Sequence, residues 1–145
     1  MDRTKEILEA SQEALMQMGL PVLLGEACDG IQFMDLQKAP HLLVAGGTKS
    51  ERDAFLKQAM RSMCAARESD EVDFYLLGKQ MNEWQLVTSA RGVYSDAESI
   101  SVGLDGLKEE MDRRYNLLAG KRCGPSFDAL KPSMPYIVAL IDGID

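Results

Sequence analysis

Runs that favour β-strands alternate with runs that favour helices through most of this 145-residue chain. The strand-type runs are "HLLVA" (41–45), "VDFYLLG" (72–78) and "YIVALIDGID" (136–145). Helix-type runs fill about 53–67 and 96–119. Parallel strands need a long crossover connection, so this order predicts an α/β fold with a mainly parallel sheet. Sheets of this class bind ligands at the carboxyl ends of their strands.

The first forty residues predict a helix followed by a β-hairpin. Residues 3–18 carry apolar side chains at roughly helical spacing, and Gly19 with Pro21 ends that run. Two short apolar runs, 22–24 and 31–34, then flank Asp29-Gly30, which is a strong hairpin signal. We therefore divide the chain into an N-terminal helix (1–18) and a core (19–145).

The helix expected over 96–119 is amphipathic. Its charged residues lie off one apolar stripe. The stripe consists of Leu104, Leu107, Met111, Tyr115 and Leu118.

Composition excludes several classes of protein. The net charge of -7 and pI near 4.7 argue against a free-standing electrostatic binder of DNA or membranes. Three scattered cysteines without a C-x-x-C pair predict neither a zinc site nor a disulfide framework. The charged N-terminus is not a signal peptide, and no apolar run is long enough to cross a bilayer. We expect a cytoplasmic protein, either alone or within a membrane-anchored complex.

The stretch "HLLVAGGTKSERDAFLKQAM" has the strand–glycine–helix layout of a phosphate-binding loop. A working loop reads G-x-x-x-x-G-K-[ST]. With Gly46 as its first glycine, the second glycine falls on Glu51, the lysine on Arg52 and the hydroxyl on Asp53. The candidate nucleotide-binding residues are Gly46, Gly47, Thr48, Lys49, Ser50, Arg52 and Asp53, together with Asp142 at the end of the last strand.

The two carboxylates in this loop argue against binding a phosphate. Glu51 and Asp53 bring negative charge to a helix N-terminus, the end that would otherwise attract an anion. Arg52 keeps the positive charge without the compact geometry of lysine. An ordinary capped helix also explains these residues, with Ser50 as N-cap and Ser50–Asp53 as a loose capping box.

The terminal strand ends on Asp142, followed by Gly143. An acid there can hold magnesium through water, but no obvious general base follows it. We predict no catalytic residue and no protein metal centre.

Four stretches together resemble the motor domain of FtsK/SpoIIIE DNA translocases. They are "LPVLLGEACDGIQFMDLQKAPHLLVAG", "VDFYLLGKQMNEW", "LKEEMDRRYNLLA" and "PYIVALIDGID", which follow the family's order over roughly 19–145. Gly46, Thr48 and Ser50 match the family's loop and Asp142 its Walker B acid. Glu51, Arg52 and Asp53 do not match, Gly143 replaces the catalytic glutamate, and Gly78 stands near the place of another acid.

The resemblance implies a RecA-like core that binds ATP and magnesium and forms a hexameric ring on duplex DNA. Its implied role is ATP-driven translocation in chromosome segregation, and relatives in type VII secretion carry degenerate copies. It also implies a later strand between the loop strand and the Walker B strand, before which this chain stops. We expect a fragment, a rearranged sheet, or a gap that a partner or second copy fills.

Three functions follow from these observations. The first is a non-hydrolysing module that assembles with active motor subunits or binds a secretion or segregation partner. The second is an active DNA-translocating ATPase in which Arg52 serves for lysine and Asp53 for the hydroxyl. The third is a plain α/β scaffold.

A small basic group lies near the last helix and consists of Arg113, Arg114, Lys121 and Arg122. It either contacts DNA phosphate or a neighbouring subunit, or it forms a solvated face.

Overall fold

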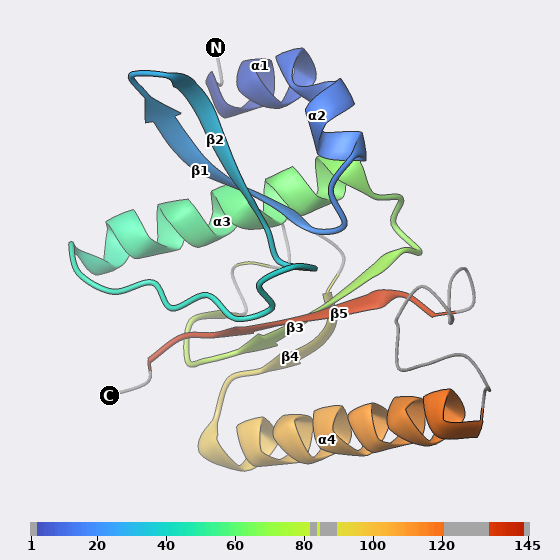
Figure 1. Cartoon of the computed structure of the whole chain (residues 1–145). Helices are drawn as coiled ribbons and strands as arrows, with labels where there is room; N and C mark the ends of the chain where they lie inside the picture. The colour runs from blue at the N-terminus through green and yellow to red at the C-terminus, as the bar shows by residue number, and fades with distance from the viewer. Residues whose placement is uncertain (1–2, 82–83, 85–89, 121–133, 144–145) are drawn as a thin grey trace. The chain divides into compact units, whose positions relative to one another are not determined.

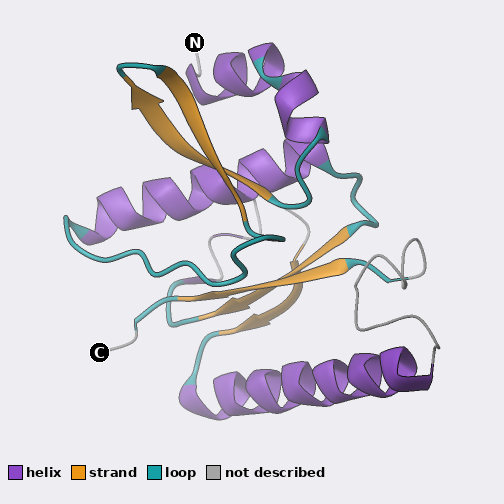
Figure 2. Ribbon diagram, viewed as in Figure 1, coloured by secondary structure: helices purple, strands orange, loops and turns teal. Residues whose placement is uncertain are grey.

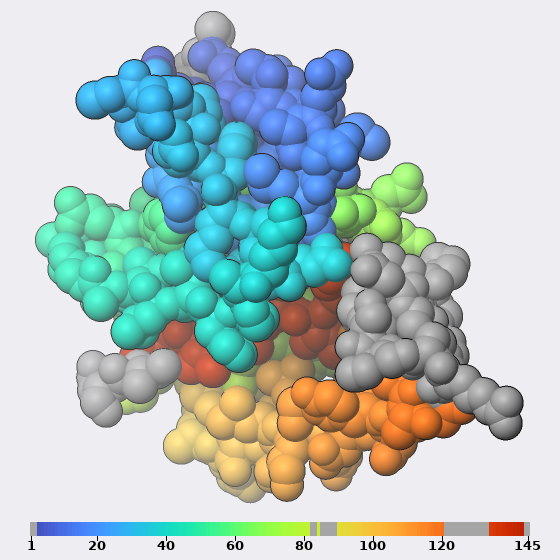
Figure 3. All heavy atoms as spheres, viewed as in Figure 1, coloured from blue at the N-terminus to red at the C-terminus, as the bar shows by residue number. Residues whose placement is uncertain are grey.

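The computed structural model describes residues 3–81, 84, 90–120 and 134–143. The chain divides into two compact units, Met1–Ser69 and Asp70–Asp145, and each is described by itself. Figure 1 labels the helices and strands, Figure 2 separates helix from strand by colour, and Figure 3 draws all heavy atoms in the same view. The chain contains both helices and strands and one sheet is entirely parallel, so the predicted α/β class, consistent with part of a RecA-like fold, is confirmed.

The first unit consists of helices and one hairpin. Helices α1 (Arg3–Ala10) and α2 (Gln12–Met16) precede strands β1 (Pro21–Ala27) and β2 (Gly30–Asp35), and helix α3 (Lys49–Ala66) follows. The single helix expected over 3–18 is interrupted at Ser11, whose N–H is shared between the carbonyls of Ile7 and Leu8. The predicted hairpin is confirmed: β1 and β2 pair antiparallel, with Ala27 opposite Gly30.

Helix α3 holds the hairpin through both side chains and backbone. The pairing of β1 with β2 shifts register between Leu23 and Gly25. At that point the N–H of Leu23 donates to Ser62 Oγ (3.1 Å), and Gln58 Nε2 donates to the Leu23 carbonyl (3.0 Å). Buried Ser62 in turn donates to the Gln58 carbonyl at 2.8 Å. Polar side chains of the helix thus satisfy a buried strand backbone.

The apolar core of the first unit lies between its helices and its hairpin. Leu8, Leu15 and Leu23 are its buried centre. Partly buried residues pack around them, namely Ile7, Ile31, Phe33, Ala65 and Ala66.

Asp35 anchors the turn that enters β1. Its carboxylate accepts hydrogen bonds from the N–H groups of Leu20 (2.9 Å), Gly19 (3.1 Å) and Gln37 (3.0 Å). Partial burial raises the pKa of this carboxyl, but the three N–H donors outweigh it and hold the pKa below its usual range. Arg67 closes the same turn by donating to the Gly19 carbonyl at 2.8 Å.

The second unit contains a three-stranded parallel sheet and one long helix. Its strands are β3 (Val72–Leu77), β4 (Ala90–Tyr94) and β5 (Tyr136–Ile141), in the order β4-β3-β5. Helix α4 (Ala97–Gly120) connects β4 to β5. The strands expected at 72–78 and 136–145 and the helix expected at 96–119 are confirmed within a few residues. Most of the stretches 80–87 and 120–135 lie outside the described residues.

The packed side of α4 differs from the predicted apolar stripe. Leu107 and Leu118 are half-buried, but Leu104, Met111 and Tyr115 are 45%, 48% and 60% exposed. The buried residue of the helix is Gly103 instead.

A close approach at Gly103 explains that difference. A Cβ there would lie 2.8 Å from the ring of Tyr94, so only glycine lets this ring rest against the helix. Further along, Arg114 Nη1 donates to the Pro135 carbonyl at 2.8 Å. Because of these contacts, the side of α4 that carries Gly103 and Arg114 packs against the rest of the unit. The predicted stripe is therefore only partly buried.

The strand expected at 41–45 does not form. These residues belong to no helix or strand, and all but Val44 are exposed, with Leu43 83% exposed. The prediction was wrong because apolar composition alone does not make a strand, which needs a neighbour for its backbone groups. Among the described residues of this unit, β1 and β2 already pair with each other.

Candidate nucleotide-binding loop

The loop before α3 turns at two glycines. Gly46 has φ +89° and Gly47 φ +60°, both in the region that favours glycine. Helix α3 then begins at Lys49, with Thr48 as its N-cap. The sequence placed the helix start near 53 and the cap at Ser50, and both placements were wrong. Ser50 lies exposed in the first helical turn.

Glu51 closes this loop on itself. Its Oε2 accepts hydrogen bonds from the N–H of Thr48 (2.7 Å) and from Thr48 Oγ1 (2.8 Å). The N–H of Glu51 donates back to Thr48 Oγ1 at 3.3 Å, which completes a capping box. The bonds from Thr48 lower the pKa of the Glu51 carboxyl, so the group is ionised at neutral pH.

The carboxylate of Glu51 also lies over Gly47. A Cβ placed on Gly47 would be 2.9 Å from Glu51 Oε2. A phosphate bound at this turn would need the same space and the same Thr48 N–H. The Glu51 carboxylate therefore occupies the position that a phosphate at this turn would need.

Both nearby cations are engaged with the chain. Arg52 Nη1 donates to the carbonyls of Gly46 (3.2 Å) and Gly47 (3.0 Å), which directs the guanidinium back into the loop. Lys49 Nζ pairs with Asp53 Oδ2 at 2.8 Å. The other oxygen of Asp53, Oδ1, is buried and has no hydrogen-bond partner.

The structure thus places Gly46, Gly47, Thr48, Lys49, Arg52 and Asp53 around the start of α3 and leaves Ser50 exposed. Sequence reasoning treated Glu51 as a misplaced acid or as an ordinary residue in the first turn of a capped helix, and did not pair it with Thr48. The Thr-x-x-Glu spacing of Thr48 and Glu51 is a capping-box signal that would have identified its partner.

Asp142 lies in the second unit, directly after β5. Its N–H donates to the Leu77 carbonyl at 2.9 Å. Gly78 follows the neighbouring strand with φ +153°, and a Cβ on it would meet the Asp142 carbonyl oxygen at 2.9 Å. Any side chain at position 78, an acid included, would therefore be strained. The expectation that Gly46 and Asp142 both end sheet strands fails at Gly46, because no strand precedes it.

Two members of the predicted basic group share one carboxylate within α4. Glu110 accepts from Arg113 Nε (2.6 Å) and Arg114 Nε (2.7 Å). The hydrogen bond from Arg113 is the largest cause that lowers the pKa of Glu110 to about 2, and Arg114 adds to it. Lys121 and Arg122 lie outside the described residues.

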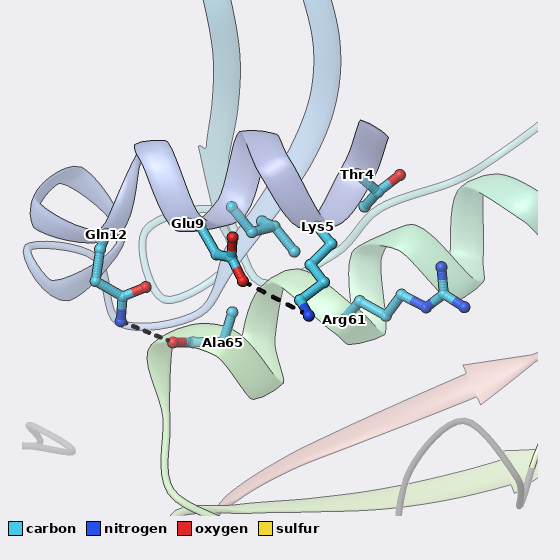
Figure 4. A pocket seen from close by; sticks show the side chains of 7 residues that line it. Thr4, Lys5, Glu9, Gln12, Arg61 and Ala65 are labelled. Carbon is cyan, nitrogen blue, oxygen red and sulfur yellow. Dashed lines mark hydrogen bonds and ion pairs between the residues drawn. The ribbon is translucent and has the colours of Figure 1, made fainter. Parts of the chain in front are cut away.

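A shallow hollow of about 400 Å³ lies between α1 and α3 (Figure 4). Gln12 Nε2 closes one end by donating to the Ala65 carbonyl at 3.2 Å. Its lining contains none of the predicted site residues: Thr4, Lys5, Leu8, Glu9, Gln12, Arg61 and Ala65. The hollow is therefore separate from the glycine loop.

Within the described part of the chain, no cluster of His, Cys, Asp or Glu could hold a metal ion. Every helix there is too short or too polar to cross a lipid bilayer.

Comparison with known proteins decides the family. A model of the FtsK/SpoIIIE family matches residues 3–124, well over half of the chain. This chain belongs to the FtsK/SpoIIIE family. It is 28% identical over 156 aligned positions to the DNA translocase FtsK of Halalkalibacterium halodurans and to the DNA translocase SpoIIIE of Bacillus subtilis. Both alignments cover 95% of this chain and 20% of the relative.

A third FtsK/SpoIIIE relative agrees. The DNA translocase FtsK of Helicobacter pylori is 26% identical over 150 positions, covering 95% of this chain and 18% of its own. The chain thus spans about a fifth of the length of these relatives.

Proposed function

We propose that this chain is a non-hydrolysing FtsK/SpoIIIE domain that acts through assembly. The observation that carries the proposal is the carboxylate of Glu51 bonded to both the N–H and the hydroxyl of Thr48. A phosphate cradle needs free N–H groups at the start of its helix, and here an internal anion uses the group at Thr48.

The neighbouring residues support the same conclusion. The family implies ATP and magnesium, but the residues present do not fit them. Arg52 is turned onto the carbonyls of Gly46 and Gly47, and Asp53 adds a second carboxylate that Lys49 already engages. In the second unit Asp142 is followed by Gly143, and an acid at position 78 would be strained.

One observation favours the alternative, an active ATP-dependent translocase. The guanidinium of Arg52 stays inside the loop, so a cation is present where the family's lysine would be. In that case ATP would displace the Glu51 carboxylate, and the Arg52 guanidinium would contact the phosphates of ATP. DNA binding and a hexamer-like ring, in the cytoplasm or in a membrane-anchored complex, would follow from the family.

Titration calorimetry with magnesium and ATP tests the proposal. We expect no binding heat from the natural chain. The triple variant Glu51→Gly, Arg52→Lys and Asp53→Ser restores the family's loop, and we expect it to bind. A Glu98→Gln variant removes an acid from the first turn of α4 and is the matched control, which should behave as the natural chain does.

Binding and hydrolysis of ATP by the natural chain would overturn the proposal in favour of the active motor.

The division into an N-terminal helix (1–18) and a core (19–145) remains part of the proposal. It would be supported if a chain lacking the first eighteen residues kept its fold by circular dichroism.

A further inference from the structure

Helix α1 reaches the apolar core of the first unit through one turn. Among residues 3–10 only Leu8 is buried, and its neighbour Ile7 is partly buried. A hollow of about 400 Å³ lies between α1 and α3, so the side chains of the two helices do not fill the space between them (Figure 4). The packing of α1 therefore depends on a single apolar turn.

Polar contacts add little to this packing. Thr4 Oγ1 donates to Gln58 Oε1 at 3.5 Å, which is the long limit of a hydrogen bond. The side chains of the ion pair between Arg3 and Glu26 are 72% and 54% exposed. Ion pairs as exposed as this one contribute little to stability. These contacts position α1 without holding it strongly.

Helix α2 is held more firmly than α1. Leu15 is fully buried in the same apolar cluster as Leu8. Gln12 Nε2 donates to the Ala65 carbonyl of α3 at 3.2 Å. After the helix, the Arg67 guanidinium donates to the Met18 carbonyl. The chain is therefore fixed to α3 from α2 onward.

Ser11 separates the two helices. Its N–H is shared between the carbonyls of Ile7 and Leu8, and its φ of -104° and ψ of 14° are not helical. Its side chain does not cap α2. A rotation at this residue would break one shared hydrogen bond of α1 and leave the bonds of α2 in place. Ser11 thus has the properties of a hinge.

We propose that α1 opens away from α3 about Ser11 while α2, the hairpin and α3 stay folded. A helix of eight residues is not stable alone in water, so α1 unfolds when it opens. Weakly packed elements of this kind open at lower free energy than the core. The inference goes beyond the proposed function and does not involve ATP.

Opening would uncover the side of α3 that lines the hollow. Gln58 would lose its contact with Thr4 but keep the bond from its Nε2 to the Leu23 carbonyl, so the hairpin would stay attached. Helix α1 therefore acts as a strap that covers or uncovers one side of α3.

Hydrogen exchange followed by NMR measures this opening. The informative amides are those of residues 7–10, because the first four N–H groups of a helix have no partner within it. We expect them to exchange at least about a hundredfold faster than the amides of 56–63 in the middle of α3. Low urea should not accelerate exchange at 7–10, since a local opening exposes little surface.

Two variants distinguish opening of α1 from unfolding of the whole unit. Leu8→Ala weakens only the closed position of α1, and exchange at 7–10 should become at least about tenfold faster. Val22→Ala truncates a fully buried residue of β1 outside the cluster around Leu8. It should accelerate exchange at 56–63 about tenfold and change exchange at 7–10 less than about twofold.

Two further variants complete the test. If circular dichroism shows that Leu8→Ala is unfolded, Ile7→Ala replaces it, because Ile7 is only partly buried. Glu13→Gln, at an exposed residue of α2, is the control and should change neither exchange rate.

Exchange at 7–10 as slow as at 56–63 would overturn the inference. A Val22→Ala chain in which both segments accelerate together would overturn it equally, because α1 would then open only when the whole unit unfolds.

Discussion

Glu51 Oε2 lies 2.7 Å from the backbone nitrogen of Thr48 and 2.8 Å from its hydroxyl. One carboxylate therefore caps a helix and fills a turn whose family counterpart binds nucleotide. Under the proposed function, the bonds that stabilise the helix at this position are also the bonds that exclude an outside anion.

The cap assignment can be tested with a matched pair. Thr48→Ala removes the side chain that accepts from the Glu51 N–H, and we expect a loss of about 1 kcal/mol in the free energy of unfolding. Ser50→Ala alters the residue that sequence alone chose as cap and should change stability by less than about 0.5 kcal/mol. Urea denaturation measures both, and the reverse order would contradict the capping box.

Two glycines of α4 should respond in opposite directions to alanine. Gly103→Ala places a Cβ 2.8 Å from the Tyr94 ring, and we expect a loss of about 1–3 kcal/mol in stability. Gly106→Ala meets nothing within 4 Å and should stabilise the helix by about 0.5–1 kcal/mol. Thermal unfolding distinguishes them, and equal effects would mean that α4 does not rest on Tyr94.

The charge cluster of α4 predicts a pH dependence. The arginines beside Glu110 lower its pKa to about 2, so its stabilising contribution is complete above about pH 4.5 and is lost as pH falls toward 2. Glu110→Gln should cost about 1–2 kcal/mol at pH 7, because part of the cluster is exposed to solvent. The deficit should shrink on acidification, as urea unfolding at several pH values would show.

The control for this cluster is Glu109→Gln, which changes the exposed neighbouring acid. Its stability should follow that of the natural chain at every pH. A deficit of Glu110→Gln that persists at pH 2 would show that the ion pairs are not its source.

Position 78 should reject the acid that the family pattern suggests. Gly78→Asp combines a φ of +153° with a contact of 2.9 Å to the Asp142 carbonyl oxygen, and we expect a loss of about 2–3 kcal/mol. Lys79→Asp, at the adjacent exposed residue, should stay within about 0.5 kcal/mol. Calorimetric unfolding compares the two variants, and a stable Gly78→Asp chain would reopen the possibility of a second acidic ligand.

Local signals predicted most of the fold. Asp29-Gly30 located the hairpin, because a tight turn depends on the residues within it. The alternation of apolar strands with a long helix likewise predicted that β3 and β5 lie in a parallel sheet. In both cases neighbouring residues carry the information, and the structure agrees.

The failures have a common physical cause. Residues 41–45 have the composition of a strand, but a strand also requires a neighbouring strand to pair with. The sequence of the segment itself does not show whether such a neighbour exists. The packed side of α4 depends on the ring of Tyr94 meeting Gly103, a contact between two separate elements. For the loop, the sequence placed the cap at Ser50 and did not predict that Glu51 would bond to Thr48.

Helix α3 connects the capped glycine loop to the hairpin. It is a continuous helix of 18 residues, about 27 Å long, with Thr48 at its start and Gln58 and Ser62 bonded to Leu23 further along. A continuous helix moves as one body. Opening the loop at Thr48 would therefore also move the hairpin, because α3 bonds to Leu23. A change in the rate of amide exchange at Leu23 would report that movement.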